Sequence, residues 1–194
     1  QSFGAWVRTP EPEALLNASI FFDFQPLAGD AGLAAELRRI LSDLTRGSEI
    51  FLRMMAVNAL AASPPLGRIR DFAVEAATGG VIDLKKFGSR IFVDAARILA
   101  LGAGIADTRT AARLRRLAAL GVIAAVDAEA AVRAFHALQD IRLAAQDEAG
   151  AGGVPGNLVD PDRLNEFDRR VLLEALRQAR ALQQRLRTRY HIET

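Results

Sequence analysis

The stretch SIFFDFQPLAGD sets one acid, Asp23, among phenylalanines. An aromatic-rich run that ends in a turn predicts a strand over residues 18–26. Side chains alternate between the two faces of a strand, so Phe22 and Phe24 would share one face, and Asp23 and Gln25 the other. Such an acid is either exposed at a sheet surface or positioned for chemistry. No neighbouring acids that could work with it are evident in the sequence.

Charged side chains gather a second time around a predicted helix over residues 89–102. The residues concerned are Lys85, Lys86, Arg90, Asp94 and Arg97. A helix N-terminus that follows a glycine-containing turn and carries nearby lysines suits an anion. The alternative is a solvated basic turn followed by a surface ion pair, which contributes about 0.3–0.5 kcal/mol.

A third polar feature is Arg142, which falls on the apolar face of a helix predicted over residues 127–148. That face consists of Ala131, Ala134, Phe135, Leu138, Ile141 and Ala145. Gln139 and Gln146 flank the arginine. A guanidinium on such a face is costly unless it is paired, so either Arg142 extends to water or the face borders a cleft. In a cleft it would meet a carboxylate or a phosphate.

Several function classes are disfavoured by composition. The chain has 194 residues, 51% hydrophobic and 25% charged, with a net charge of +2 and no cysteine. These values are typical of one large globular domain, or one domain plus a fragment, without disulfides or thiolate zinc sites. No secretory leader or long apolar span is evident, which predicts a cytoplasmic protein. The small net charge makes nucleic acid an unlikely partner, although arginines recur over residues 109–116 and 177–189.

The elements that must position these residues are mostly helical. Apolar spacing predicts helices over residues 31–46, 89–102, 108–120 and 127–148. A further helix is predicted from Ser48 to before Pro64, and a last one from the Asp160-Pro161 pair to about Tyr190. Between them, residues 72–74 and 82–84 predict a β-hairpin. The predicted fold class is therefore mainly α, an antiparallel helical bundle with a β-hairpin, preceded by one strand.

Several segments, in order, resemble a bacterial family of signal-transduction nucleotidyltransferases. They include NASIFFDFQPLAGD, NALAASPPLGRIRDF, GGVIDLKKFGSRIFVDAARILALGAGI, DIRLAAQ and PGNLVDPDRLNEFDRRVLLEALRQARALQQRLRTRY. In that family, cyclic-nucleotide-binding or CBS domains precede a catalytic domain similar to PII uridylyltransferase. The resemblance implies that residues 1–46 are the C-terminal remnant of the catalytic domain and that residues 47–194 are its helical substrate-binding domain. It also implies that the chain is a fragment of a longer protein and is inactive alone.

The resemblance also implies a reaction. Such enzymes move a nucleoside monophosphate from an NTP to an acceptor, with Mg²⁺ held by carboxylates. Asp23 matches the third carboxylate, which makes it the expected catalytic and metal-binding residue. The family's Gly-Ser turn and paired acids are not found in this chain, and Gln25 stands where the family typically has arginine.

The expected site therefore combines Asp23 with a set of substrate-binding residues. These are Asp83, Lys85, Lys86, Arg90, Arg97, Arg142 and Gln146. Asp83 enters through the resemblance, which also implies that Lys85 faces the catalytic cleft. The expected partners are an NTP and an acceptor, for which a PII-like protein is one choice. The alternative is a non-catalytic helical module that binds a partner protein or forms a homodimer.

Overall fold

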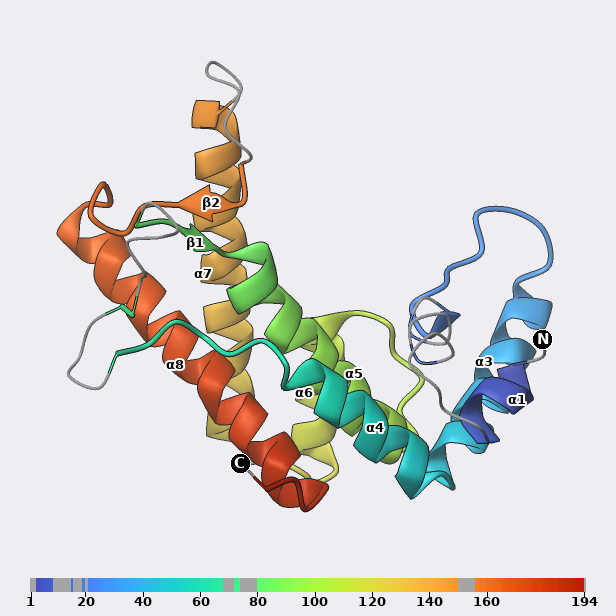
Figure 1. Cartoon of the computed structure of the whole chain (residues 1–194). Coiled ribbons are helices and arrows are strands. Elements are labelled where there is room, and N and C mark those ends of the chain that lie inside the picture. The colour runs from blue at the N-terminus through green and yellow to red at the C-terminus, as the bar shows by residue number, and fades with distance from the viewer. Residues whose placement is uncertain are drawn as a thin grey trace.

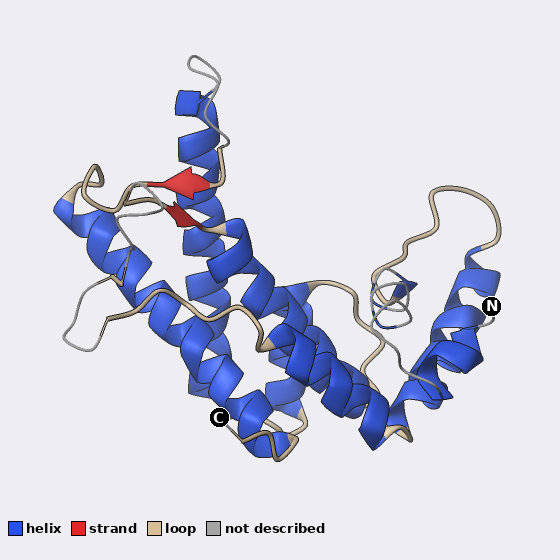
Figure 2. Ribbon diagram, in the orientation of Figure 1, coloured by secondary structure: helices blue, strands red, loops and turns tan. Residues whose placement is uncertain are grey.

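A computed structural model gives the fold of the chain. It describes residues 3–8, 15, 19, 21–67, 72–73, 80–149 and 156–193. Over these residues the protein is mainly helical, with one small antiparallel sheet at one end of the helical bundle (Figures 1 and 2). The predicted mainly α class is confirmed.

Helix α5 (Arg90–Gly102) lies at the centre of the molecule and packs against four other helices. Its neighbours are α3 (Ala31–Arg46), α4 (Glu49–Ala59), α6 (Thr110–Ala119) and α8 (Glu166–Arg189). Most of its residues are buried, because apolar side chains cover its circumference apart from one stripe formed by Arg90, Asp94 and Arg97. Each charged residue of α5 that is not at its exposed start therefore needs a partner.

Helix α7 (Ala125–Ala149) completes the bundle by packing against α6 and α8. Its predicted apolar face is confirmed, since Leu138 is fully buried and Phe135 packs against the core. A π-helical turn, Lys85–Ser89, runs directly into α5. A Cβ on Gly88 within this turn would lie 3.2 Å from the Leu138 side chain, so glycine lets the turn approach α7 closely.

Two helices begin where they are predicted to begin, each after a capping side chain. Asp30 accepts a hydrogen bond from the Gly32 N–H at the start of α3, and Ser48 accepts one from the Phe51 N–H at the start of α4. The predicted start of the last helix at Asp160 is wrong. The chain forms a turn there, after a short strand, and α8 begins at Glu166. Asn165 caps the helix, because its side chain accepts a hydrogen bond from the Asp168 N–H.

The strand predicted over residues 18–26 is not formed in the described part of that range. Ser19 and Phe21 are helical, residues 22–23 form a turn and residues 24–26 have no regular structure; residues 18 and 20 lie outside the description. A strand needs a hydrogen-bonding neighbour, and the described residues offer this segment none. Phe22 is instead buried edge-on against Phe51, with ring centroids 6.0 Å apart.

The N-terminal helix α1 (Phe3–Arg8) packs against α3, apart from the main bundle (Figure 1). Trp6 of this helix lies 5.7 Å from the ring centroid of Phe21. The segment that leads to Asp23 is therefore attached to α1 on one side and to the bundle on the other.

The predicted hairpin exists as a two-stranded sheet, but its strands are not the predicted pair. Strand β1 (Ile82–Asp83) pairs antiparallel with β2 (Leu158–Val159), so Ile82 lies opposite Val159. Phe72 forms a single bridge with Leu66 instead, and residues 74–79 lie outside the described chain. The connection from α7 to α8 returns past β1 and supplies the partner, which local sequence pattern does not reveal.

Candidate functional site

Asp23 lies in a turn and points at two arginines of the bundle. Arg97 of α5 donates its Nε to Asp23 Oδ2 at 3.2 Å, and its Nη2 also contacts this oxygen. Arg113 of α6 brings its Nη2 within 2.7 Å of Asp23 Oδ1. The carboxylate thus joins the segment before α3 to the two helices through charge. We call these three residues the Asp23 cluster.

Arg113 is the most buried member of the Asp23 cluster, with 2% of its surface exposed. It also donates to the backbone carbonyls of Asp107, at 2.6 Å, and Phe22, at 3.3 Å. Burial lowers the pKa of Arg113, and the facing carboxylate of Asp23 opposes that shift. A buried guanidinium held by one carboxylate and two carbonyls is a structural anchor for the residue 22–23 turn.

Arg113 was not among the predicted site residues, although the sequence contains a signal for it. The buried positions of α6 are Thr110, Arg113, Leu114 and Leu117, which recur at helical spacing. An arginine on such a stripe demands a partner, as Arg142 does on α7.

The stripe predicted on α5 is present and extends from Arg97. Asp94 accepts a hydrogen bond from Arg97 Nη1 at 2.8 Å and another from Arg90 Nε at 3.2 Å. Arg97 is therefore shared between Asp94 and Asp23, while Arg90 is largely exposed at the end of the chain of charges.

Arg142 belongs to a different polar group. Its Nη2 donates to Asn157 Oδ1 at 2.8 Å and its Nη1 to Gln139 Oε1 at 2.7 Å, and Ser89 Oγ lies 3.3 Å from the same Nη1. The guanidinium thus meets amide and hydroxyl oxygens, neither open water nor a carboxylate. Ser89 and Arg97 are eight residues apart on one helix, about 12 Å, so this group lies well along α5 from the Asp23 cluster.

The remaining predicted residues lie near the small sheet. Asp83 Oδ1 accepts hydrogen bonds from the backbone N–H groups of Lys85 and Lys86, each at 2.9 Å. The Lys86 ammonium lies 4.8 Å from the centroid of the Phe87 ring. Gln146 is exposed, and a Cβ on Gly156 would clash with its side chain and its Cα. The structure therefore unites Asp23 with Arg97 and does not join Arg142 or the residue 83–86 turn to them.

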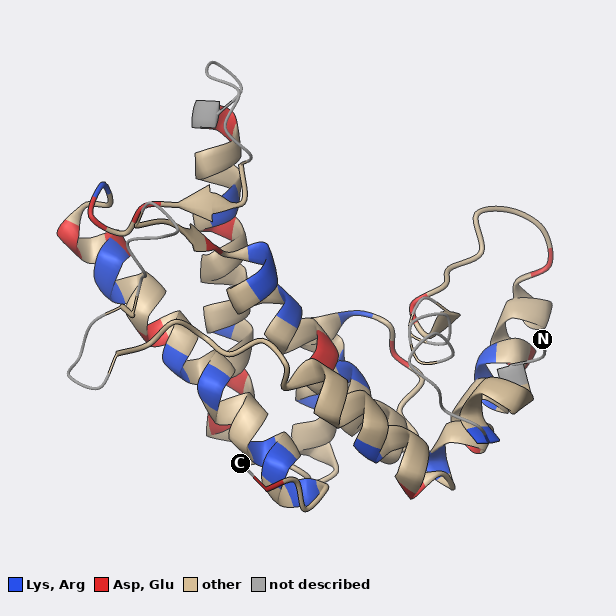
Figure 3. Ribbon diagram, in the orientation of Figure 1, with Lys and Arg blue, Asp and Glu red and all other residues tan. Residues whose placement is uncertain are grey.

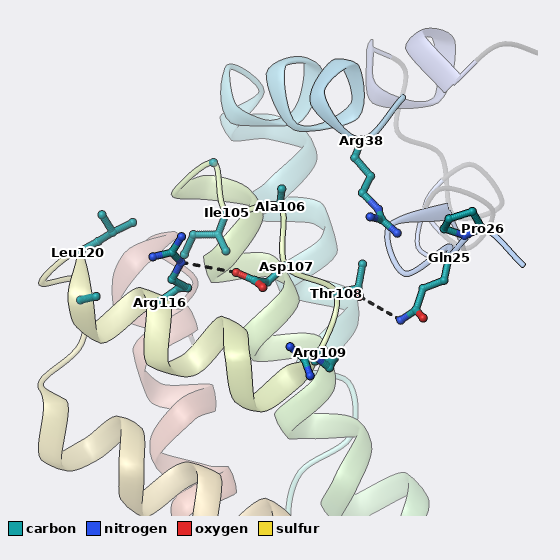
Figure 4. A pocket seen from close by; sticks show the side chains of 12 residues that line it. Gln25, Pro26, Arg38, Ile105, Ala106, Asp107, Thr108, Arg109, Arg116 and Leu120 are labelled. Atoms are coloured by element: carbon teal, nitrogen blue, oxygen red, sulfur yellow. Dashed lines mark hydrogen bonds and ion pairs between the residues drawn. The ribbon is translucent and has the colours of Figure 1, made fainter. Parts of the chain in front are cut away.

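A cavity of about 880 Å³ lies beside the Asp23 cluster, between the N-terminal segment and α6. Figure 4 shows Gln25 and Pro26 on one side, with Arg38 of α3 above them. Arg116 of α6 lies on the other side, and Arg109 lies at the start of that helix, next to Thr108. We call this space the arginine pocket. An adjoining cavity of about 670 Å³ shares Arg109 and Arg116.

The loop between α5 and α6 holds the floor of the arginine pocket in place. Gln25 Nε2 donates to Thr108 Oγ1 at 3.2 Å, and Asp107 Oδ2 lies 3.7 Å from Arg116 Nε (Figure 4). The pocket thus has three arginines and one acid among its charged lining residues. Elsewhere on the molecule, basic and acidic residues are both spread over the helices in the view of Figure 3.

The residues near Asp23 do not make a magnesium site by themselves. Both carboxylate oxygens of Asp23 already face guanidinium groups, which repel a cation. In the described part of the chain, no three His, Cys, Asp or Glu side chains are grouped closely enough to hold a metal ion. Asp23 would have to exchange partners and act with ligands from elsewhere.

A comparison with protein families gives the domain an identity. The family described as "putative nucleotidyltransferase substrate binding domain" matches residues 49–190, about three quarters of the chain. This chain belongs to that family. The search of curated proteins found no match, and neither did the search of solved structures.

The substrate-binding domain contributes one side of the Asp23 cluster and one side of the arginine pocket. Arg97, Arg109, Arg113 and Arg116 fall within the matched range, whereas Asp23 and the N-terminal residues that line the arginine pocket precede it. Both the Asp23 cluster and the arginine pocket therefore lie where the family domain meets the segment before it. Among the described helices, none is long and apolar enough to cross a membrane.

Proposed function

We propose that this chain is the substrate-binding part of a signalling protein that transfers a nucleoside monophosphate from an NTP to an acceptor. The family assignment supports the substrate-binding role. The observation that carries the proposal further is the contact of Asp23 with Arg97 and Arg113, because it ties the acid of the preceding segment to the family domain.

In this proposal the arginines of the domain position the turn that carries Asp23 and take no part in the reaction themselves. Arg97 and Arg113 hold the residue 22–23 turn against α5 and α6, so that Asp23 faces the domain that binds the substrate. Asp23 is the proposed catalytic carboxylate. Magnesium binding stays a prediction for the whole protein, since other acids would have to complete the ligand set. A PII-like protein is one class of acceptor that fits this proposal.

The decisive measurement is transfer of labelled nucleotide by the full-length protein. We expect Asp23→Asn to lower the rate of transfer by about a hundredfold or more, because it removes a charge from the reacting centre. Asp94→Asn is the matched control, since it removes an acid from the same chain of arginines without touching the turn. Full transfer activity in Asp23→Asn would remove Asp23 from the mechanism.

A second function, dimerisation, is favoured by one surface. Leu33, Leu37, Ile40 and Leu44 of α3 are all at least partly exposed, and they repeat at intervals of four, three and four residues. That spacing is typical of a coiled-coil seam. In this alternative α3 pairs with α3 of a second copy of the chain, and the helical domain is an interaction module.

A further inference from the structure

We propose that the arginine pocket binds the phosphate groups of a nucleoside polyphosphate directly, through Arg38, Arg109 and Arg116. The inference deepens the proposed function and rests on it, since it names the substrate class of the same domain. The Asp23 cluster lies beside this pocket but does not line it.

The first argument is that the charge of the pocket is poorly compensated. Arg109 is exposed, and no ion pair joins it to any residue that the structure describes. The one ion pair of Arg116 within the part of the chain that the structure describes is to Asp107, with a separation of 3.7 Å, and its side chain is 70% exposed. An anion entering here would gain charge-assisted hydrogen bonds without first breaking strong ones.

Arg38 contributes the second argument, because it is held in position before any ligand arrives. Its Nη2 donates to the Phe24 carbonyl at 2.9 Å, and its guanidinium carbon lies 5.1 Å from the centroid of the Phe24 ring. Its Nε is buried without a hydrogen-bond partner among the described residues. A guanidinium fixed in this way loses little conformational freedom on binding an anion.

The third argument is the spacing of the cations. Arg109 directly precedes α6 and Arg116 lies two turns into that helix, so they are roughly 10 Å apart along its axis, and Arg38 reaches in from α3. Three guanidinium groups distributed around one cavity suit several linked phosphates better than a single carboxylate. The cavity of about 880 Å³ lies within the usual range for small-molecule sites.

The apolar lining of the pocket is the reason to expect a ligand that has a nucleoside attached to its phosphate groups. Pro26, Ile105 and Leu120 line the same cavity as the arginines (Figure 4). A ligand with an anionic part and a flat, less polar part matches both kinds of lining. Inorganic triphosphate would satisfy the arginines alone, so comparing it with ATP and UTP separates the two contributions.

Titration calorimetry on the 194-residue chain tests the proposal. The probes are ATP, UTP and inorganic triphosphate in a buffer with a metal chelator, so that the arginines act without magnesium. We expect Arg109→Ala and Arg116→Ala each to weaken binding about tenfold, the usual effect of losing a hydrogen bond to a charged group. Both side chains are exposed, so the fold should survive either change.

Two further variants control for charge and for folding. Arg177→Ala removes one exposed positive charge on α8, outside the pocket, and should leave binding unchanged. Gln25→Arg adds a cation to the lining and should tighten binding several-fold, a gain that damage to the fold cannot produce.

Equal losses in Arg177→Ala and Arg109→Ala would overturn the proposal, because binding would then follow net charge alone. Failure of all three probes to bind at about 1 mM would also overturn it. These outcomes are separate from the transfer assay with Asp23→Asn. Transfer by the full-length protein without binding here would refute the pocket alone, and binding without transfer would refute the proposed reaction alone.

Discussion

At the scale of the residue, the pairing of Asp23 with Arg113 is the feature with the clearest energetic consequence. Arg113 is buried, donates hydrogen bonds to two backbone carbonyls and forms an ion pair with the Asp23 carboxylate. Removal of the guanidinium would leave those acceptors without their donor, and the cost of such orphaned groups usually exceeds the value of the pair itself.

We therefore expect Arg113→Met to lower the free energy of unfolding by about 2–4 kcal/mol, measured by urea denaturation. Combining it with Asp23→Asn should give a loss smaller than the sum, because the two residues share one interaction. Arg115→Met is the control, since Arg115 lies on the same helix in an exposed pair with Glu129 and should change stability little. Additive losses would show that Arg113 acts through the carbonyls alone.

At the scale of the element, the end of α8 packs on α5 through Tyr190. This side chain is 3% exposed, and a Cβ on Gly102 would lie 3.0 Å from its hydroxyl. Burial raises the pKa of Tyr190 to about 12. The unfolded chain would release that proton near its usual pKa of about 10, so the junction is sensitive to high pH.

The contribution of Tyr190 to stability should be complete below about pH 10 and lost as the pH rises from about 10 to 12. The loss should amount to about 2–3 kcal/mol, because the folded state holds the proton that the unfolded state releases. Urea unfolding at several pH values measures it. Tyr190→Phe should flatten the curve in this range, and an unchanged curve would contradict the assignment.

Elements governed by local chemistry could be predicted from the sequence, and those governed by distant partners could not. The Asp30 and Ser48 caps depend on residues within one turn, so α3 and α4 begin as predicted. The partner of β1 lies some 75 residues downstream, and no local pattern identifies Leu158–Val159 for it. For the same reason the chain around Asp23 lacks the strand that its composition favours.

The candidate site divides in the same way. Asp23 and Arg97 could each be singled out by residue type and spacing, and they do meet. Arg38 and Arg109 read as ordinary surface residues, because a pocket formed by α3 and α6 together requires the tertiary fold. Arg142 was correctly identified as an arginine needing partners, but its partners, Asn157 among them, were not.

At the scale of the whole molecule, the exposed apolar face of α3 leads to a prediction about oligomeric state, because the alternative function is dimerisation through this face. If α3 pairs with a second copy, light scattering should show a dimer that dissociates on dilution, and Leu37→Glu should yield a monomer. Val126→Glu is a control, because Val126 is 74% exposed on α7. A monomer at all concentrations would leave the nucleotide-binding function as the sole proposal.

The attachment of α1 beside Phe21 has a practical consequence for following the protein as it folds. The chain contains one tryptophan and one tyrosine. Trp6 lies with the N-terminal segment, whereas Tyr190 lies at the α5–α8 junction of the bundle. Tryptophan fluorescence therefore reports the docking of the N-terminal segment, and tyrosine absorbance reports the bundle. The chain carries two separate optical probes, one in the N-terminal segment and one in the bundle, without any label.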